Sequence, residues 1–164
     1  MFNRILIAVN DSDPANLALE AGAQLAAQLG ATVGVVHVVV PAFVYTPDVA
    51  IADDRILTEL RREGRDLLRR AAARIPPSVR CEQFMTEGDP ADRIVDAADQ
   101  FGADLIVLGT HGRGRISQFF LGSTAEAVIR RATCPVLVAR PRRAHAPADV
   151  GHSAPAPAPP NPVR

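Results

Sequence analysis

Three glycines and two hydroxyl side chains stand in a pattern that could hold a phosphate group. Gly109 ends an apolar run, Gly112 follows three residues later, and after nine more residues Gly122 leads directly into Ser123 and Thr124. Because glycine has no Cβ, it can adopt a positive φ, and a ligand can approach its main chain closely enough to meet the N–H group. The pattern therefore predicts a phosphate or nucleotide site.

A helix expected from Thr124 to Arg131 strengthens this prediction. The first N–H groups of a helix have no partners within it and lie at the positive end of its dipole, where phosphate is attracted. An alternative interpretation needs no ligand, because Ser123 and Glu126 have the spacing of a capping box.

The charges of the chain exclude several classes of function. The 18 basic residues balance 18 acidic ones, so no overall field attracts nucleic acid or an anionic membrane. Every basic residue is arginine, which excludes the lysine of a Walker loop and any lysine Schiff base. No segment resembles a membrane span or a signal peptide, and Cys81 and Cys134 lack metal-ligand spacing. We therefore expect a cytoplasmic protein with reduced, buried thiols.

Apolar runs and amphipathic segments alternate along the chain. Strands are expected over residues 4–9, 32–40, 79–86, 104–108 and 135–139, and helices over residues 15–29, 54–75, 90–101 and 124–131. Asp13 and Asp89 are the expected N-caps, and residues 42–51 are expected to form a loop. Because strictly alternating strands and helices require right-handed crossovers, the sequence predicts a doubly wound α/β fold with a five-stranded parallel sheet and helices on both faces.

The composition divides the chain into two parts. Residues 1–140 are expected to form one α/β domain. Residues 141–164 are rich in proline and alanine, with almost nothing to bury, and are expected to form a disordered or polyproline II tail. Such a tail could be passive or could recruit a protein that reads proline.

The carboxyl ends of the first, second and fourth strands should meet at one edge of the sheet, at Asn10, Val38 and Gly109. Asn10 carries a donor and an acceptor, so it could hold a ribose hydroxyl or an adenine edge, or else form an Asx turn. Arg113 lies within the glycine loop and could pair with phosphate oxygens, or it could be a solvated surface residue.

Two histidines and an acidic turn complete the candidates. His111 could transfer a proton, but no nucleophile or carboxylate is placed beside it by the sequence, so a hydrogen-bonding role in the loop is the other interpretation. His37 is expected to be satisfied within the second strand. Asp11, Ser12 and Asp13 could help to bind Mg²⁺ carried by a nucleotide, or they could cap the first helix.

The glycine pattern, the apolar run before it and the segment 134–138 after it together resemble the universal stress protein family. Residues 5–12 resemble the opening of that family, and the likeness covers about residues 2–140. The glycine motif is the version associated with members that bind ATP, whereas members that do not bind it usually lack these glycines.

The resemblance implies a Rossmann-like sheet in the order 3-2-1-4-5 and a homodimer paired through strand five at Val136, Leu137 and Val138. It implies ATP as the ligand. The residues that it places around the ligand are Ala8, Val9, Asn10 and Val38 for adenine, Gly109 for ribose, and Gly112, Arg113, Gly122, Ser123 and Thr124 for the phosphates. We add Thr110 and His111 because they belong to the same loop.

This chain departs from the family pattern at one position of that site. The family usually has aspartate where Asn10 stands, often followed by glycine where Asp11 stands. Asparagine keeps an acceptor but loses the charge, which bears on nucleotide affinity and base choice.

Three functional hypotheses follow. The first is a dimeric ATP-binding regulatory protein whose interaction with an unknown protein partner changes with nucleotide occupancy. The second is a dimeric scaffold that acts without nucleotide, in which the glycine loop is a tight connection. The third is slow ATP hydrolysis or adenylate transfer, with Arg113 and helix amides stabilising the transition state, although no general base is evident.

Overall fold

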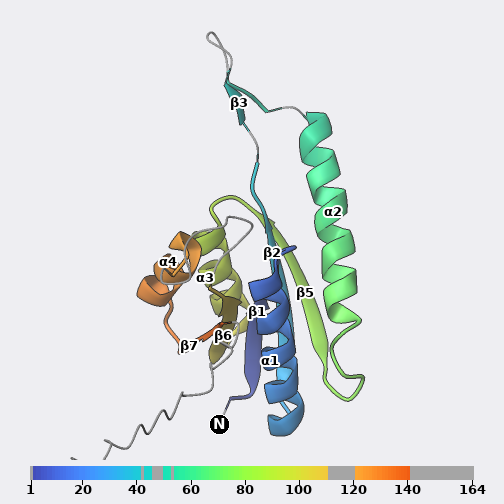
Figure 1. Ribbon diagram of the computed structural model, residues 1–164, viewed down its shortest axis with the longest axis vertical. Helices are drawn as coiled ribbons and strands as arrows, with labels where there is room; N and C mark the ends of the chain where they lie inside the picture. Colours follow the sequence, from blue (N-terminus) through green and yellow to red (C-terminus); the bar gives the residue numbers. More distant parts are fainter. Residues whose placement is uncertain (1, 42, 46–49, 53, 111–120, 141–164) are drawn as a thin grey trace, which may run out of the picture.

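The computed structural model describes residues 2–41, 43–45, 50–52, 54–110 and 121–140. Five parallel strands form its main sheet (Figure 1). In spatial order they are β5 (Cys81–Glu87), β2 (Thr32–Val39), β1 (Arg4–Ala8), β6 (Leu105–Gly109) and β7 (Val136–Ala139). Numbered among these five strands alone, the order is 3-2-1-4-5, which confirms the predicted fold.

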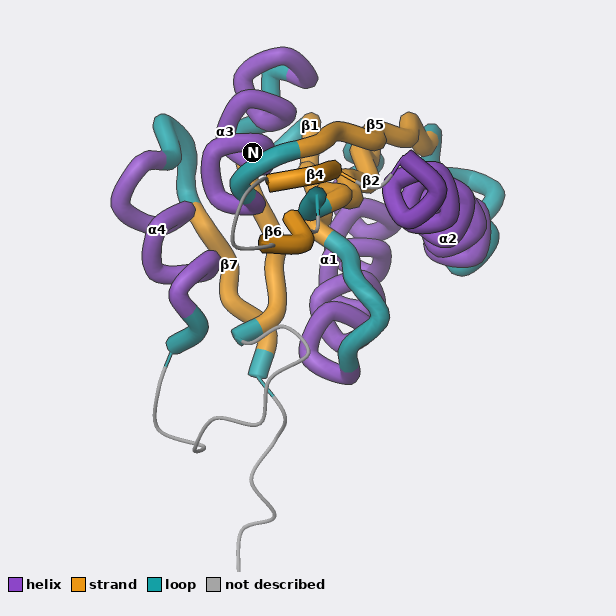
Figure 2. Tube along the Cα trace, turned by 90° about the horizontal axis from the view of Figure 1, so that it is seen from above, coloured by secondary structure: helices purple, strands orange, loops and turns teal. Residues whose placement is uncertain are grey.

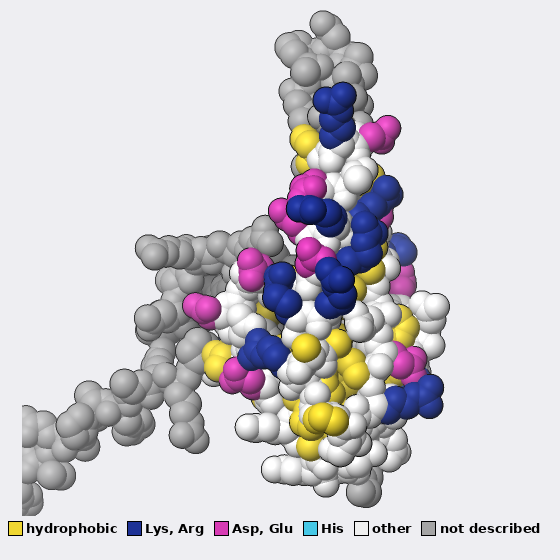
Figure 3. Space-filling view, turned by 90° about the vertical axis from the view of Figure 1, so that its right-hand side faces the viewer, with side chains coloured by type: hydrophobic (Ala, Val, Ile, Leu, Met, Phe, Trp, Pro, Cys, Tyr) yellow, Lys and Arg dark blue, Asp and Glu magenta, His cyan; other side chains and the backbone are white. Residues whose placement is uncertain are grey.

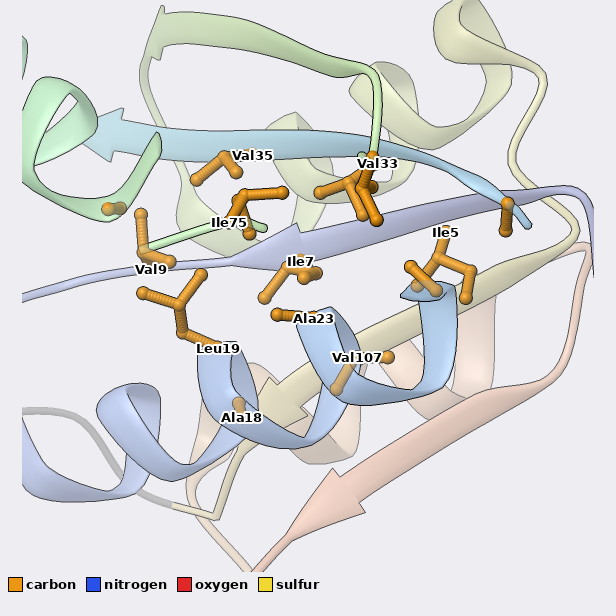
Figure 4. Packing of buried hydrophobic residues seen from close by; sticks show 14 of the residues in the cluster. Ile5, Ile7, Val9, Ala18, Leu19, Ala23, Val33, Val35, Ile75 and Val107 are labelled. Carbon is orange, nitrogen blue, oxygen red and sulfur yellow. The ribbon is translucent and has the colours of Figure 1, made fainter. Parts of the chain in front are cut away.

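Four helices cover the two faces of this sheet in pairs (Figure 2). The helices α1 (Asp13–Leu29) and α2 (Asp54–Ala72) pack on one face, and α3 (Pro90–Phe101) and α4 (Ser123–Arg131) pack on the other. Successive residues of β1 point to opposite faces, so Ile5 and Ile7 pack on the side of α1 (Figure 4). Leu6 packs on the other face, with residues of α3. This burial on both faces explains why the strands read as continuous apolar runs.

The helix boundaries largely follow the expected capping signals. Asp89 caps α3 by accepting hydrogen bonds from two backbone N–H groups, and Gly30 and Gly102 end α1 and α3 in the left-handed conformation. The prediction that Asp13 caps α1 was wrong. Ser12 is the N-cap, because its Oγ accepts from the N–H of Ala15, and Asp13 is already helical.

The expected loop over residues 42–51 was also a wrong prediction. Residues Phe43–Tyr45 (β3) and Ala50–Ala52 (β4) pair as a separate antiparallel ribbon of two strands. Phe43, Val44, Tyr45 and Ile51 have high strand propensity, and the prolines that suggested a loop lie outside the paired residues.

Asp104, which directly precedes β6, binds backbone groups at the amino end of the sheet. Its carboxylate accepts hydrogen bonds from the N–H groups of Asn3, at 2.7 Å, and Arg4, at 3.0 Å. The Arg4 guanidinium lies 4.1 Å from the centre of the Phe101 ring and donates to the Phe101 carbonyl at 2.6 Å. These contacts join the first strand to the connection between α3 and β6.

No helix in the described part of the chain is long and apolar enough to span a membrane. The predicted proline- and alanine-rich tail lies outside the described residues.

Replacing Asp104 should measurably destabilise the domain. Asp104→Ala leaves two backbone N–H groups without a charged acceptor, so we expect the free energy of unfolding to fall by about 2–4 kcal/mol in urea titrations. Asp96→Ala is the matched control, because Asp96 makes only an exposed ion pair with Arg93, and its cost should stay within about 0.5 kcal/mol. Equal losses in the two variants would contradict the clamping role of Asp104.

Candidate functional site

A cavity of about 920 Å³ opens where the carboxyl ends of β1, β2 and β6 meet. Nine of the twelve predicted site residues line it: Ala8, Val9, Asn10, Val38, Gly109, Thr110, Gly122, Ser123 and Thr124. The other three, His111, Gly112 and Arg113, lie outside the described residues. Three strands and the start of α4 thus bring together residues that are more than a hundred positions apart in the chain.

Thr110 and Gly122, which lie on either side of the segment 111–120, are hydrogen-bonded to each other at the cavity wall. The N–H of Gly122 donates to the carbonyl of Thr110 at 2.6 Å, and the N–H of Thr110 donates to the carbonyl of Ala139 at 3.2 Å. Thr110 is buried, with only 4% of its surface exposed. These bonds hold the start of α4 against the end of β6.

The amino terminus of α4 opens into this cavity without a side-chain cap. Its N-cap is Gly122, and no side chain caps it within the described chain. Ser123 is the first residue of the helix, one position too late to act as an N-cap. The capping-box interpretation of Ser123 and Glu126 was therefore wrong, and the first N–H groups of α4 stand beside the cavity.

Gly109 is required by packing. A Cβ on Gly109 would lie 2.5 Å from the Pro14 carbonyl carbon and 2.8 Å from the Ala15 nitrogen, both of which are backbone atoms. Among the described glycines, positive φ occurs at Gly30, Gly88 and Gly102 only, so the suggested conformational role does not apply to Gly109. The absent side chain instead lets the first turn of α1 rest on the end of β6.

Asn10 follows β1 and takes part in a side-chain hydrogen bond at the cavity wall. The Ser12 hydroxyl donates to Asn10 Oδ1 at 2.5 Å, and Ser12 Oγ accepts from the N–H of Ala15 at 3.3 Å. The side chain of Asn10 is partly buried. Within the described residues, the Asn10 side chain thus bonds to another side chain.

One wall of the cavity is formed by α2 and was not predicted from the sequence. Along α2, residues at helical spacing line the cavity: Leu60, Glu63, Gly64, Asp66, Leu67 and Arg70. Gly64 makes room for His37, whose ring Cδ2 would lie 2.8 Å from a Cβ at that position. The Nδ1 of His37 lies 3.0 Å from the carbonyl oxygen of Val9, which is the satisfied role expected for it in the sheet.

An ion pair holds α2 to the sheet beside this wall. Arg61 donates twice to Glu87 at the end of β5, at 2.6 and 3.1 Å. The hydrogen bond from Arg61 lowers the pKa of the Glu87 carboxyl, and the same bond raises the pKa of Arg61. The outer surface of α2 carries charged side chains of both signs (Figure 3), so the helix exposes polar groups outward and buries Leu67 and Leu68.

The two cysteines lie away from this cavity and are free. Each thiol is only partly buried, which corrects the expectation of fully buried thiols. Burial nevertheless raises the pKa of both Cys81 and Cys134, so both favour the neutral thiol.

The cavity lies at the carboxyl edge of a doubly wound sheet beside a helix start, and comparison with known proteins agrees with this architecture. The profile of the Universal stress protein family matches residues 1–140. The chain belongs to the universal stress protein family.

Individual family members align over most of this chain. The universal stress protein YxiE of Bacillus subtilis is 33% identical over 150 residues, which covers 85% of this chain and all of that protein. The universal stress protein MJ0531 of Methanocaldococcus jannaschii is 35% identical over 143 residues, covering 85% of this chain and 83% of that protein.

Two solved structures of the family were determined with nucleotides. A universal stress protein in complex with cAMP is 26% identical, with a TM-score of 0.64, and the alignment covers 85% of this chain and 97% of that one. The universal stress protein of Archaeoglobus fulgidus in complex with dAMP is 28% identical, with a TM-score of 0.61, covering 85% and 98%.

Gly109 provides a test of the packing at this site. Gly109→Ala forces backbone atoms of α1 and β6 apart, so we expect the free energy of unfolding to fall by about 2 kcal/mol in urea titrations. At Gly34 a new Cβ would meet only side-chain atoms, at 3.0–3.1 Å, so Gly34→Ala should cost less. A smaller loss for Gly109→Ala than for Gly34→Ala would show that α1 can retreat from β6 easily.

Proposed function

We propose that this protein binds ATP, with Mg²⁺ carried by the nucleotide, and that it acts as a dimeric regulator whose state depends on nucleotide occupancy. The observation that carries the proposal is the uncapped start of α4 beside a cavity that nine predicted site residues line. Both relatives solved with nucleotides hold an adenine nucleotide, cAMP or dAMP. This supports an adenine nucleotide as the ligand here.

The phosphates would lie at the start of α4. The positive end of the helix dipole, the N–H groups of the first turn and the hydroxyls of Ser123 and Thr124 all favour an anion there. Gly122 carries no side chain that would occupy this space. Gly112 and Arg113 would complete the phosphate site from the segment outside the described residues.

The distribution of charge supports this orientation of the ligand. Away from α4, the described lining includes the carboxylates of Asp11, Glu63 and Asp66, and Arg70 is the cation among the described lining residues. Carboxylates repel phosphate, whereas they accept hydrogen bonds from the hydroxyls of ribose and the amino group of a base. The nucleoside would therefore lie toward β2 and α2, against Val9, Val38 and Leu67.

The dimer would form through β7. Among the described strands, β7 pairs with β6 alone and lies at an end of the sheet, so its other edge could pair with a partner strand. Leu137 on this strand is 38% exposed and Ile129 on the neighbouring α4 is 45% exposed. An antiparallel partner strand would pair the free backbone groups and cover these side chains.

One observation favours the second candidate, a dimeric scaffold that needs no nucleotide. Gly109 has a sufficient structural reason in its contact with Pro14 and Ala15, so its presence does not by itself require a ligand. No comparable packing contact explains why, within the described residues, no side chain caps the start of α4. We therefore place nucleotide binding first.

A carboxylate at position 122 should abolish nucleotide binding. In Gly122→Glu a charged side chain enters the proposed phosphate site, so we expect isothermal titration with ATP and Mg²⁺ to show at least about 100-fold weaker binding. Gln83→Glu adds the same charge at an exposed residue of β5, outside the cavity lining, and should bind like wild type. Absence of heat with wild type, or equal binding by both variants, would refute the ATP proposal.

Leu137 should control assembly. Leu137→Asp places a charge in the proposed dimer contact, and we expect it to shift the protein to monomer in analytical ultracentrifugation at micromolar concentration. Ile56→Asp makes the same change at an equally exposed apolar residue on α2, with 38% exposure, and should leave the assembly unchanged. A dimer that survives Leu137→Asp and dissociates in Ile56→Asp would place the interface on α2.

A further inference from the structure

The hydrogen bond between Ser12 and Asn10 determines what Asn10 can offer to a ligand. An asparagine amide carries an acceptor oxygen and a donor nitrogen on the same carbon, so it can turn and present either group. Here Ser12 Oγ already accepts from the N–H of Ala15, and its own hydrogen points to Asn10 Oδ1. This bond uses one lone pair of the amide oxygen and fixes which way the amide faces.

The distance supports this assignment of oxygen and nitrogen. Ser12 Oγ lies 2.5 Å from its partner atom on Asn10. That separation lies within the range of O–H···O hydrogen bonds and is shorter than normal N–H···O bonds, which begin at about 2.7 Å. A turned amide, with Nδ2 toward Ser12, would normally stand farther from the Ser12 oxygen.

We propose that Ser12 is a positioning residue for ligand recognition, because it holds Asn10 so that the amide nitrogen Nδ2 donates to an acceptor atom of the bound nucleoside. This inference rests on the proposed nucleotide site. Asn10 lines the cavity, and within the described residues Nδ2 has no recorded hydrogen-bond partner. The ligand must then present a hydrogen-bond acceptor to Asn10. An aspartate at position 10 would instead require a hydrogen-bond donor from the ligand.

Two of the hydrogen bonds of Ser12 can be separated by substitution. As the N-cap of α1 Ser12 accepts a hydrogen bond, and toward Asn10 it donates one. Ser12→Thr keeps both bonds. Ser12→Asp keeps the cap, since aspartate is among the best N-cap residues, but its carboxylate has no hydrogen to donate and repels Oδ1. The amide then turns, and Asn10 presents its oxygen to the ligand.

The experiment compares these two variants with ATP and with adenosine, because adenosine carries no charge that a new carboxylate could repel. We expect Ser12→Asp to bind both ligands about tenfold more weakly than Ser12→Thr, which should bind like wild type. In ¹H–¹⁵N spectra the side-chain amide signals of Asn10, assigned by their loss in Asn10→Ala, should shift when adenosine saturates wild type. The same signals should stay in place in Ser12→Asp.

Further measurements distinguish a failure of the role of Ser12 from a failure of the proposed nucleotide binding. Thermal unfolding checks that the cap is intact, and Ser12→Gly, a tolerated N-cap without a hydroxyl, gives a neutral second variant with an expected loss of about threefold. If both ligands bind Ser12→Asp and Ser12→Thr equally, or if only ATP binding weakens, Ser12 does not position Asn10. If wild type binds neither ligand, the proposed function itself fails, and the inference fails with it.

Discussion

The backbone of β6 and the first turn of α1 touch at Gly109, where there is no room for a side chain. This contact determines how closely the segment that follows β1 approaches the end of β6. It therefore sets the width of the crevice between Asn10, which precedes α1, and Thr110, which follows Gly109. The bond from Gly122 to Thr110 then places the start of α4 at the same crevice. The absence of a Cβ at Gly109 thus influences the positions of Asn10, Thr110 and the start of α4.

Much of the fold follows from local patterns in the sequence. Continuous apolar runs indicate strands buried on both faces, and β1, with Ile5, Leu6 and Ile7 fully buried, is the clearest case. The alternation of strands and helices leaves few topologies, because crossovers between parallel strands are right-handed. The order of the strands needs more than periodicity, and here it came from the likeness to a family, which the observed order confirms.

The sequence indicated which residues at strand ends line the cavity, but it did not indicate which helix covers them. Asn10, Val38 and Gly109 lie at or just beyond the carboxyl ends of neighbouring strands, so the topology alone brings them together. The wall from α2 was missed, because an amphipathic helix shows in its sequence which face is apolar and not which part of the sheet that face will cover. Gly64 was the available signal, since a glycine within a helix suggests a close contact, here with His37.

The remaining errors concern single residues with similar side chains. Ser12 and Asp13 are both good N-caps, and the choice between them depends on where the backbone leaves the extended conformation, as Ser12 does at φ −130° and ψ 152°. The same one-residue difference at Ser123 has a larger consequence, because it moves the hydroxyl from the N-cap into the helix. The backbone N–H groups at the start of α4 then lack the side-chain partner that a capping box would provide.

Apart from Arg113, the proposed phosphate site would use no cationic side chain and would rely on backbone N–H groups. Its donors are fixed by β6, by the contact at Gly109 and by the start of α4, so they need no rearrangement and lose no side-chain entropy when an anion binds. This suits a chain with no lysine and no net charge, which cannot attract an anion through its overall field. Selectivity must then come from the side chains that meet the rest of the ligand. We expect Asn10 to contribute to this selectivity, because its hydrogen bond with Ser12 sets the direction of its amide before a ligand arrives.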